Sequence, residues 1–221
     1  MKARPPGLRW RHVLRTLLAL TVATALADVA IRTFDQDTPG VPPPGFTFSA
    51  ARQPAPGRWF VRADGANQFL SHAADPGSSG FSLATLDATA PPRLRVSARL
   101  KLIDGERTGG LVWRYQDPDN YYLVSLDLRR QEIALYRVVR GNRIRLEEED
   151  DLELDGDAWH TVRVVHDDDR IRVALGGIGV MRARDRALPA PGRAGLWSGG
   201  STTGWFDDLR VEEEPEDQDR R

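Results

Sequence analysis

Hydrophobic and polar residues alternate with a period of two along much of the chain. The clearest run is Leu94 to Leu102, LRVSARLKL, where every second residue is Leu, Val or Ala. This period places the apolar side chains on one face of a β-strand. Similar runs rich in β-branched and aromatic residues follow: GGLVWRY, NYYLVSLDL, EIALYRVV, NRIRLE, WHTVRVV, RIRVALG, RAGLWS and WFDDLRV. We predict ten to thirteen strands and no amphipathic helix.

Turn signals separate these runs. Gly141 and Asn142 can adopt positive φ, which suits a tight hairpin. QDPDN, Gln116 to Asn120, places a proline between aspartates that can hydrogen-bond their own backbone, and HDDDR, His166 to Arg170, separates two further runs. Strands with one apolar face bury it by packing sheet on sheet. The pattern therefore predicts an all-β fold, a two-sheet antiparallel β-sandwich.

The two ends of the sequence differ from the middle. Residues 1–27 combine basic residues with the apolar run TLLALTVATALA, which is typical of a signal peptide and too short to span a bilayer comfortably. We expect an extracytoplasmic protein, periplasmic or secreted, without membrane insertion if the signal is cleaved; an uncleaved N-terminal anchor is the alternative. A Pro/Gly-rich lead-in or linker is expected at 28–56, one domain at 57–212 and a charged disordered tail at 213–221.

Charge and cysteine content narrow the function classes. Five of the 31 basic residues and none of the 32 acidic ones lie in the predicted signal, so cleavage leaves 26 basic against 32 acidic residues. An acidic chain is a poor nucleic-acid binder, and we expect no nucleic-acid partner. The absence of cysteine excludes disulfides, thiolate metal sites and a cysteine nucleophile.

The succession GGLVWRYQDPDNYYLVSLD, LYRVVRGNR, WHTVRVVHDDDRIRVALGG, PGRAGLWS and WFDDLRV resembles the concanavalin A-like lectin/glucanase superfamily. More narrowly, it is similar to the laminin-G-like and 3-keto-disaccharide hydrolase-type jelly rolls of exported bacterial proteins. The resemblance covers about Phe46 to Glu212. It implies a concanavalin A-like jelly roll with a convex and a concave sheet, the concave one often binding or cleaving sugars.

One acidic stretch has the spacing of a glucanase active site. Glu149, Asp151 and Glu153 follow the pattern E-x-D-x-E, which resembles the catalytic strand of laminarinase-type glucanases. In that register Asp150 would face the core, where an unpaired carboxylate is costly. Burying Leu152 and Leu154 instead leaves the carboxylates in water. We therefore assign no catalytic residue and favour a non-catalytic protein over an enzyme.

Metal and cofactor chemistry has little support in the sequence. Asp117, Asp119 and Asn120 offer oxygen ligands at a spacing that suits calcium, although a turn explains the same residues. His160 and His166 would lie roughly 20 Å apart on one strand, too far to share an ion. No cofactor and no metal site is assigned, with calcium as the one alternative.

A candidate binding cleft follows from the two faces of the aromatic strands. Tyr122, Val124 and Leu126 form the more apolar set of NYYLVSLDL and are expected in the core. In LVWRY, Trp113 and Tyr115 are expected on one face and Arg114 on the other. The predicted carbohydrate-binding cleft comprises Arg114, Tyr121, Ser125, Asp127 and Arg137.

The chemistry of this set suggests sugars, because aromatic rings stack on sugar faces and arginines bind hydroxyls and carboxylates. We expect an exported, non-catalytic module that recognises a glycan or another envelope component. Two alternatives stay open: a glycoside hydrolase of the 3-keto-disaccharide hydrolase type, and a structural or interaction module without a sugar ligand.

Overall fold

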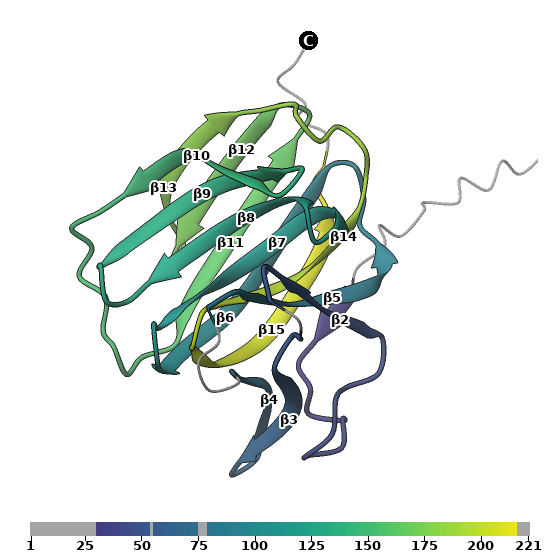
Figure 1. The fold of residues 1–221 in the computed structure, drawn as a ribbon, viewed down its shortest axis with the longest axis vertical. Helices are drawn as coiled ribbons and strands as arrows, with labels where there is room; N and C mark the ends of the chain where they lie inside the picture. The colour runs from purple at the N-terminus through teal and green to yellow at the C-terminus, as the bar shows by residue number, and fades with distance from the viewer. Residues whose placement is uncertain (1–29, 54, 75–78, 216–221) are drawn as a thin grey trace, which may run out of the picture.

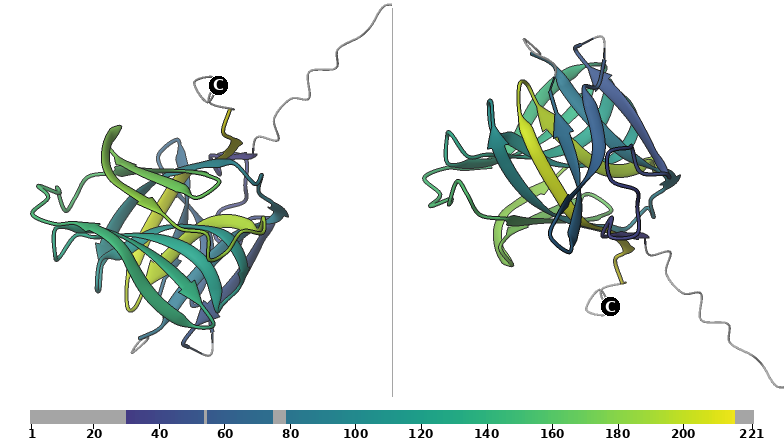
Figure 2. Two further views of the ribbon diagram at one scale, coloured as in Figure 1. Left: turned by 90° about the horizontal axis from the view of Figure 1, so that it is seen from above. Right: turned by 90° about the horizontal axis from the view of Figure 1, so that it is seen from below.

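The structure is a computed structural model that describes residues 30–53, 55–74 and 79–215. The predicted signal peptide and most of the charged tail lie outside this range. Within it the chain forms two antiparallel sheets that face each other and no helix (Figure 1, Figure 2). Among the described residues there is thus no helix that could cross a membrane. The predicted β-sandwich is confirmed.

The first sheet has eight strands in the order β13-β12-β11-β6-β15-β4-β3, with β1 paired to β15. Its strands are β1 (Ala30–Arg32), β3 (Arg58–Asp64), β4 (Asn67–Ala73), β6 (Leu94–Asp104), β11 (His160–Asp167), β12 (Arg170–Leu175), β13 (Ile178–Arg184) and β15 (Thr203–Glu213).

The second sheet has seven strands in the order β10-β9-β8-β7-β14-β5-β2. Its strands are β2 (Phe46–Ala51), β5 (Phe81–Thr89), β7 (Thr108–Asp117), β8 (Asn120–Asp127), β9 (Glu132–Val139), β10 (Asn142–Glu149) and β14 (Arg193–Gly199).

The main core lies between the sheets and follows the predicted alternation. Every second residue of Leu94 to Leu102 in β6 is buried, and all five of these apolar side chains belong to this core. Tyr122, Val124 and Leu126 of β8 belong to it as well, as predicted. The period-two pattern therefore identified which face of these strands is buried.

The lead-in differs from the irregular segment that we expected at 28–56. Residues 30–32 form β1 on β15, and residues 46–51 form β2, which pairs with β5 along its whole length. The apolar alternation of Phe46 and Phe48 is short, and the surrounding prolines obscure it. The first ordered strand thus precedes the RWFVRA run.

The turn between β9 and β10 lies one residue earlier than the sequence suggested. Arg140 and Gly141 occupy it, with φ of 51° and 73°, and Asn142 already begins β10. Glycine adopts this conformation without cost, whereas Arg140 adopts it because a two-residue hairpin needs positive φ at both positions. The aspartate turn is confirmed, since the Asp119 amide donates to Asp117 Oδ1 at 2.8 Å.

A β-bulge in β7 corrects the predicted faces of LVWRY. Arg114 has φ of 48°, and the pairing with β8 shifts between Trp113 and Asp117. The bulge inserts a residue and reverses the alternation. Trp113 therefore lies in the main core, whereas Tyr115 lies on the opposite side of the sheet.

The acidic stretch does not form a catalytic strand. Only Glu149 of the E-x-D-x-E pattern belongs to β10, and Asp151, with φ of 53°, lies beyond it in a segment without strand pairing. Leu152 and Leu154 pack against the main core, as predicted. Glu149, Asp151 and Glu153 are exposed, so the carboxylates face solvent.

Candidate functional site

The seven-stranded sheet curves around the face that it turns away from the main core. Strands β2 and β10 are its opposite edges, yet Arg52, just beyond β2, donates from Nη2 to the Gly141 carbonyl beside β10 at 3.2 Å. The guanidinium of Arg143 in β10 also lies 5.4 Å from the ring centroid of Phe81 in β5. Only a strongly curved sheet can bring these strands so close, so this is its concave face.

A second apolar cluster covers the concave face. It is separate from the main core and includes Trp197, which is 2% exposed. Strand alternation explains it, because the neighbours of core residues point the other way. The cluster consists of Ala51, Leu83, Val112, Tyr115, Tyr121, Leu123, Val138 and Trp197, with Phe81 and Tyr136 packed against it.

Three residues form the partly exposed surface of this cluster: Phe81, Tyr136 and Arg143. The Cζ atom of Arg143 lies 3.7 Å from the ring centroid of Tyr136 and 5.4 Å from that of Trp197. Burial lowers the pKa of Arg143, and the nearby tyrosine rings oppose that change. An arginine remains charged under these conditions. We call Phe81, Tyr136 and Arg143 the platform.

Tyr121 lies beneath one end of the platform. It is 2% exposed, and burial raises its pKa to about 12, so the phenol is neutral at physiological pH. The adjacent cavity, lined in part by Arg52, Pro118 and Arg143, has a volume of only about 10 Å³. This cavity is too small for a sugar ring, so a ligand at this end of the face would rest on the platform.

Ser125 and Asp127 lie further along β8 on the same concave face. Ser125 is 6% exposed. Asp127 accepts hydrogen bonds from the amides of Arg129 and Arg130 at 2.9 and 3.0 Å, which stabilises the β8–β9 turn. Its direct cross-strand neighbour is Glu132. These residues mark the acidic end of the face.

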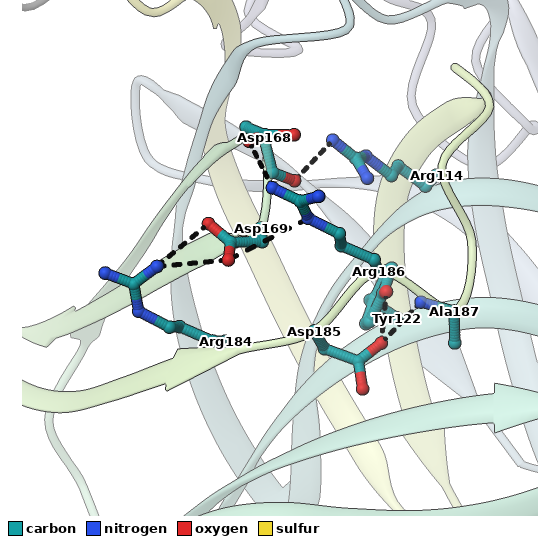
Figure 3. A network of polar contacts seen from close by, with 8 residues as sticks. All are labelled: Arg114, Tyr122, Asp168, Asp169, Arg184, Asp185, Arg186 and Ala187. Atoms are coloured by element: carbon teal, nitrogen blue, oxygen red, sulfur yellow. Dashed lines mark hydrogen bonds and ion pairs between the residues drawn. The ribbon is translucent and has the colours of Figure 1, made fainter.

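Arg114 does not lie on the concave face, and its partners are backbone carbonyls of loops. The residue is 4% exposed, and its guanidinium donates to the carbonyls of Leu188, Pro92 and Asp168 at 2.9, 3.2 and 3.4 Å. The bulge at Arg114 directs the side chain toward these loops at the end of the sandwich (Figure 3). One buried cation thus joins three separate segments of the chain.

Arg137 belongs to the same end of the sandwich. It pairs with Asp185, which also accepts from the Tyr122 hydroxyl at 2.6 Å and the Ala187 amide at 2.8 Å (Figure 3). Burial would raise the pKa of Asp185, but these hydrogen bonds and the arginine outweigh it and hold the pKa below its usual value. The carboxylate is therefore ionised, and both of its oxygens accept hydrogen bonds within the protein.

The five predicted residues therefore occupy two places. Tyr121, Ser125 and Asp127 share the concave face, whereas Arg114 and Arg137 lie at the end of the sandwich, where Arg137 pairs with the Asp185 drawn in Figure 3. The platform was not identified from the sequence. The β9–β10 turn pairs Arg143 with Val138, and strand alternation places Val138 on the same face as Tyr136, so this part of the platform had a signal in the sequence. The curvature that brings Phe81 to them has no signal in the sequence.

The possible calcium ligands take part in a turn. Asn120 Nδ2 donates to both carboxylate oxygens of Asp117, at 2.9 and 3.1 Å. Within residues 30–53, 55–74 and 79–215, no three His, Cys, Asp or Glu side chains are grouped as a metal site. Calcium at this turn stays a prediction.

Comparison with known proteins identifies the fold. No protein-family model and no curated protein matches the sequence. Among solved structures, the carbohydrate-binding module CBM66 from Bacillus subtilis is 20% identical, with a TM-score of 0.61 over 75% of this chain and 95% of that one. Domain 4 of AbnA, a GH43 extracellular arabinanase from Geobacillus stearothermophilus in complex with arabinotriose, is 14% identical, with a TM-score of 0.58 over 85% and 93%.

A third structure is an enzyme. A prokaryotic β-1,3-1,4-glucanase (lichenase) derived from a mouse hindgut metagenome is 14% identical, with a TM-score of 0.56 over 84% of this chain and 98% of that one. Identities this low establish the fold and leave function to the site itself. The chain has the concanavalin A-like jelly-roll fold, as the resemblance implied.

Proposed function

We propose that this protein is an exported, non-catalytic carbohydrate-recognition module and that its glycan binds the platform on the concave face. The observation that carries the proposal is the contact of Arg143 with Tyr136, beside Phe81 and above Trp197. Two domains of the same fold support it: one is a carbohydrate-binding module, and the other was solved in complex with arabinotriose.

The platform has the chemistry that sugar binding needs. Aromatic rings present apolar faces that match the C–H faces of sugar rings, and a guanidinium supplies fixed donors to hydroxyl or carboxylate oxygens. Phe81, Tyr136 and Arg143 are each partly exposed, so a ligand can reach them without unfolding the face. The buried cluster beneath holds them in place, which limits the entropy lost on binding.

Calorimetric titration with a panel of oligosaccharides, arabinotriose included, tests the proposal. Tyr136→Ala and Arg143→Ala are expected to weaken binding of the best ligand at least tenfold. The matched control is Arg62→Ala, because the Arg62 guanidinium also lies over an indole, that of Trp205, at 5.0 Å on the eight-stranded sheet.

The control variant distinguishes a loss of binding at the platform from a loss of folding. Arg62→Ala should bind like the unaltered protein, and all variants should unfold cooperatively. The proposal fails if no saccharide binds at millimolar concentration, or if the platform variants bind as well as the control.

Hydrolysis is the second candidate, and one observation favours it. Asp127 and Glu132 are direct cross-strand neighbours on the concave face, and both pair with Arg130 at 3.8 Å. Paired carboxylates are the usual groups for glycoside hydrolysis. Release of reducing sugar by the unaltered protein, with loss of that activity in Asp127→Asn and Glu132→Gln, would establish an enzyme. Absence of turnover would leave carbohydrate recognition as the remaining function.

A further inference from the structure

Four arginines form a square on the outer face of the β12–β13 hairpin. Arg170 lies directly opposite Arg184, and Arg172 directly opposite Arg182. The residues between them, such as Ile171, point into the main core, so all four arginines point outward. Opposite residues of paired strands have Cβ atoms about 5 Å apart, and successive residues on one face are about 7 Å apart. Four positive charges thus share one small patch.

Only part of this charge is compensated within the protein. Arg172 pairs with Glu214 at 3.3 Å, and Arg184 pairs with Asp169 at 3.1 Å. Arg170 and Arg182 are exposed and have no ion pair or hydrogen bond with any residue that the structure describes. Like charges directly opposite each other destabilise a sheet, so this arrangement has a cost in the free protein.

The same arginines line a hollow of about 780 Å³. Glu147 of β10, the edge strand of the other sheet, contributes to its wall. Strands β10 and β13 lie side by side at this end of the sandwich (Figure 1). The hollow is therefore wide enough for more than one sugar-sized group, and it combines several cations with one carboxylate.

We propose that this arginine hollow is a second binding site, separate from the platform, for an anionic polysaccharide whose carboxylate or sulfate groups pair with the arginines. Arg170 and Arg182 are the main contacts, because they have no competing carboxylate. Guanidinium groups bind carboxylate and sulfate oxygens through paired hydrogen bonds. An anion between the opposed arginines also removes their mutual repulsion.

The surroundings favour an acidic glycan over a nucleic acid. Glu147 lies in the wall, and the acidic run Glu147 to Asp151 follows along β10 and beyond it. Duplex DNA carries one charge for about every 1.7 Å of its axis, so these carboxylates would repel neighbouring phosphates. A charged polysaccharide has hydroxyl groups between its anionic groups, and Glu147 can accept hydrogen bonds from them.

Affinity electrophoresis of the full chain tests the site with polygalacturonate, dextran sulfate, neutral dextran and duplex DNA. At about 20 mM salt, where exposed charges are weakly screened, the unaltered protein should bind at least one anionic polysaccharide and not dextran. Arg170→Gln with Arg182→Gln should weaken this binding about tenfold and reduce its dependence on salt. The preference between the two polyanions identifies the anionic group.

Matched variants make the result decisive. Arg58→Gln with Arg62→Gln removes two exposed arginines from the outer face of the same sheet and changes net charge equally. It should bind the polyanions as the unaltered protein does. The proposal is overturned if no polyanion binds, if both arginine pairs matter equally, if neither matters, or if DNA binds as tightly as the polysaccharides.

Discussion

Arg52 and Gly141 are separated by the full width of a seven-stranded sheet, yet Nη2 of Arg52 lies 3.2 Å from the Gly141 carbonyl oxygen. One residue lies just beyond the edge strand β2, and the other lies in the turn before the opposite edge strand β10. This contact closes one end of the concave face above Tyr121.

Arg52→Ala should loosen this closure without unfolding the domain. The Arg52 side chain is exposed, so the free energy of unfolding should fall by no more than about 1 kcal/mol. Amide hydrogen exchange in the β9–β10 hairpin should accelerate, because Gly141 loses a contact with the rest of the sheet. Arg129→Ala, in the exposed β8–β9 turn, is the control and should leave exchange in that hairpin unchanged.

Arg114→Ala should destabilise the protein strongly and leave glycan affinity unaltered in the folded fraction. The variant removes a buried cation that donates to three loop carbonyls, and we expect a loss of about 3 kcal/mol in urea unfolding. Arg186→Ala removes an arginine that is 67% exposed and pairs with Asp168, so it should cost at most about 1 kcal/mol. Reduced sugar binding by folded Arg114→Ala would contradict the structural role.

His166 should make the protein sensitive to mild acid. Its ring is fully buried and accepts from Trp113 Nε1 at 2.9 Å; burial and then Arg114 lower its pKa from 6.5 to about 3. The unfolded chain therefore takes up the proton first, and the stabilisation present above about pH 6.5 declines as pH falls toward 3. The slope should approach 1.4 kcal/mol for each pH unit.

A comparison of two histidine variants isolates this effect. His166→Asn retains an acceptor for the Trp113 indole and should flatten the dependence of unfolding free energy on pH between about 6 and 4. His160→Asn, on the same strand but partly exposed, is the matched histidine replacement. An equal slope in both variants would assign the acid sensitivity to other groups.

Gly110→Ala should disrupt the centre of the seven-stranded sheet. A Cβ atom at Gly110 would lie 1.8 Å from the Val124 carbonyl oxygen, and a paired backbone cannot move away cheaply. We expect a loss of about 3 kcal/mol or failure to fold, measured by urea unfolding and expression level. Gly179→Ala is the control, because nothing lies within 4 Å of its Cβ position.

The sequence by itself determined the fold class and the buried faces. Alternation in β6 and β8 predicted which residues enter the main core, because the pleat of a strand assigns sides with a period of two. It also showed that Asp150 makes the E-x-D-x-E stretch a poor catalytic strand, and the structure leaves Asp151 and Glu153 outside any strand. These are local properties, which depend only on neighbouring residues.

Tertiary structure alone decided where the predicted site residues meet. The bulge at Arg114 reversed the alternation of β7, because an added residue shifts every later side chain to the other face. The side chain of Arg114 therefore contacts loops that are distant in the sequence. Sheet curvature brought Phe81, Tyr136 and Arg143 together from strands β5, β9 and β10. Such contacts depend on strand order and twist summed over many residues, and no short stretch of the sequence encodes them.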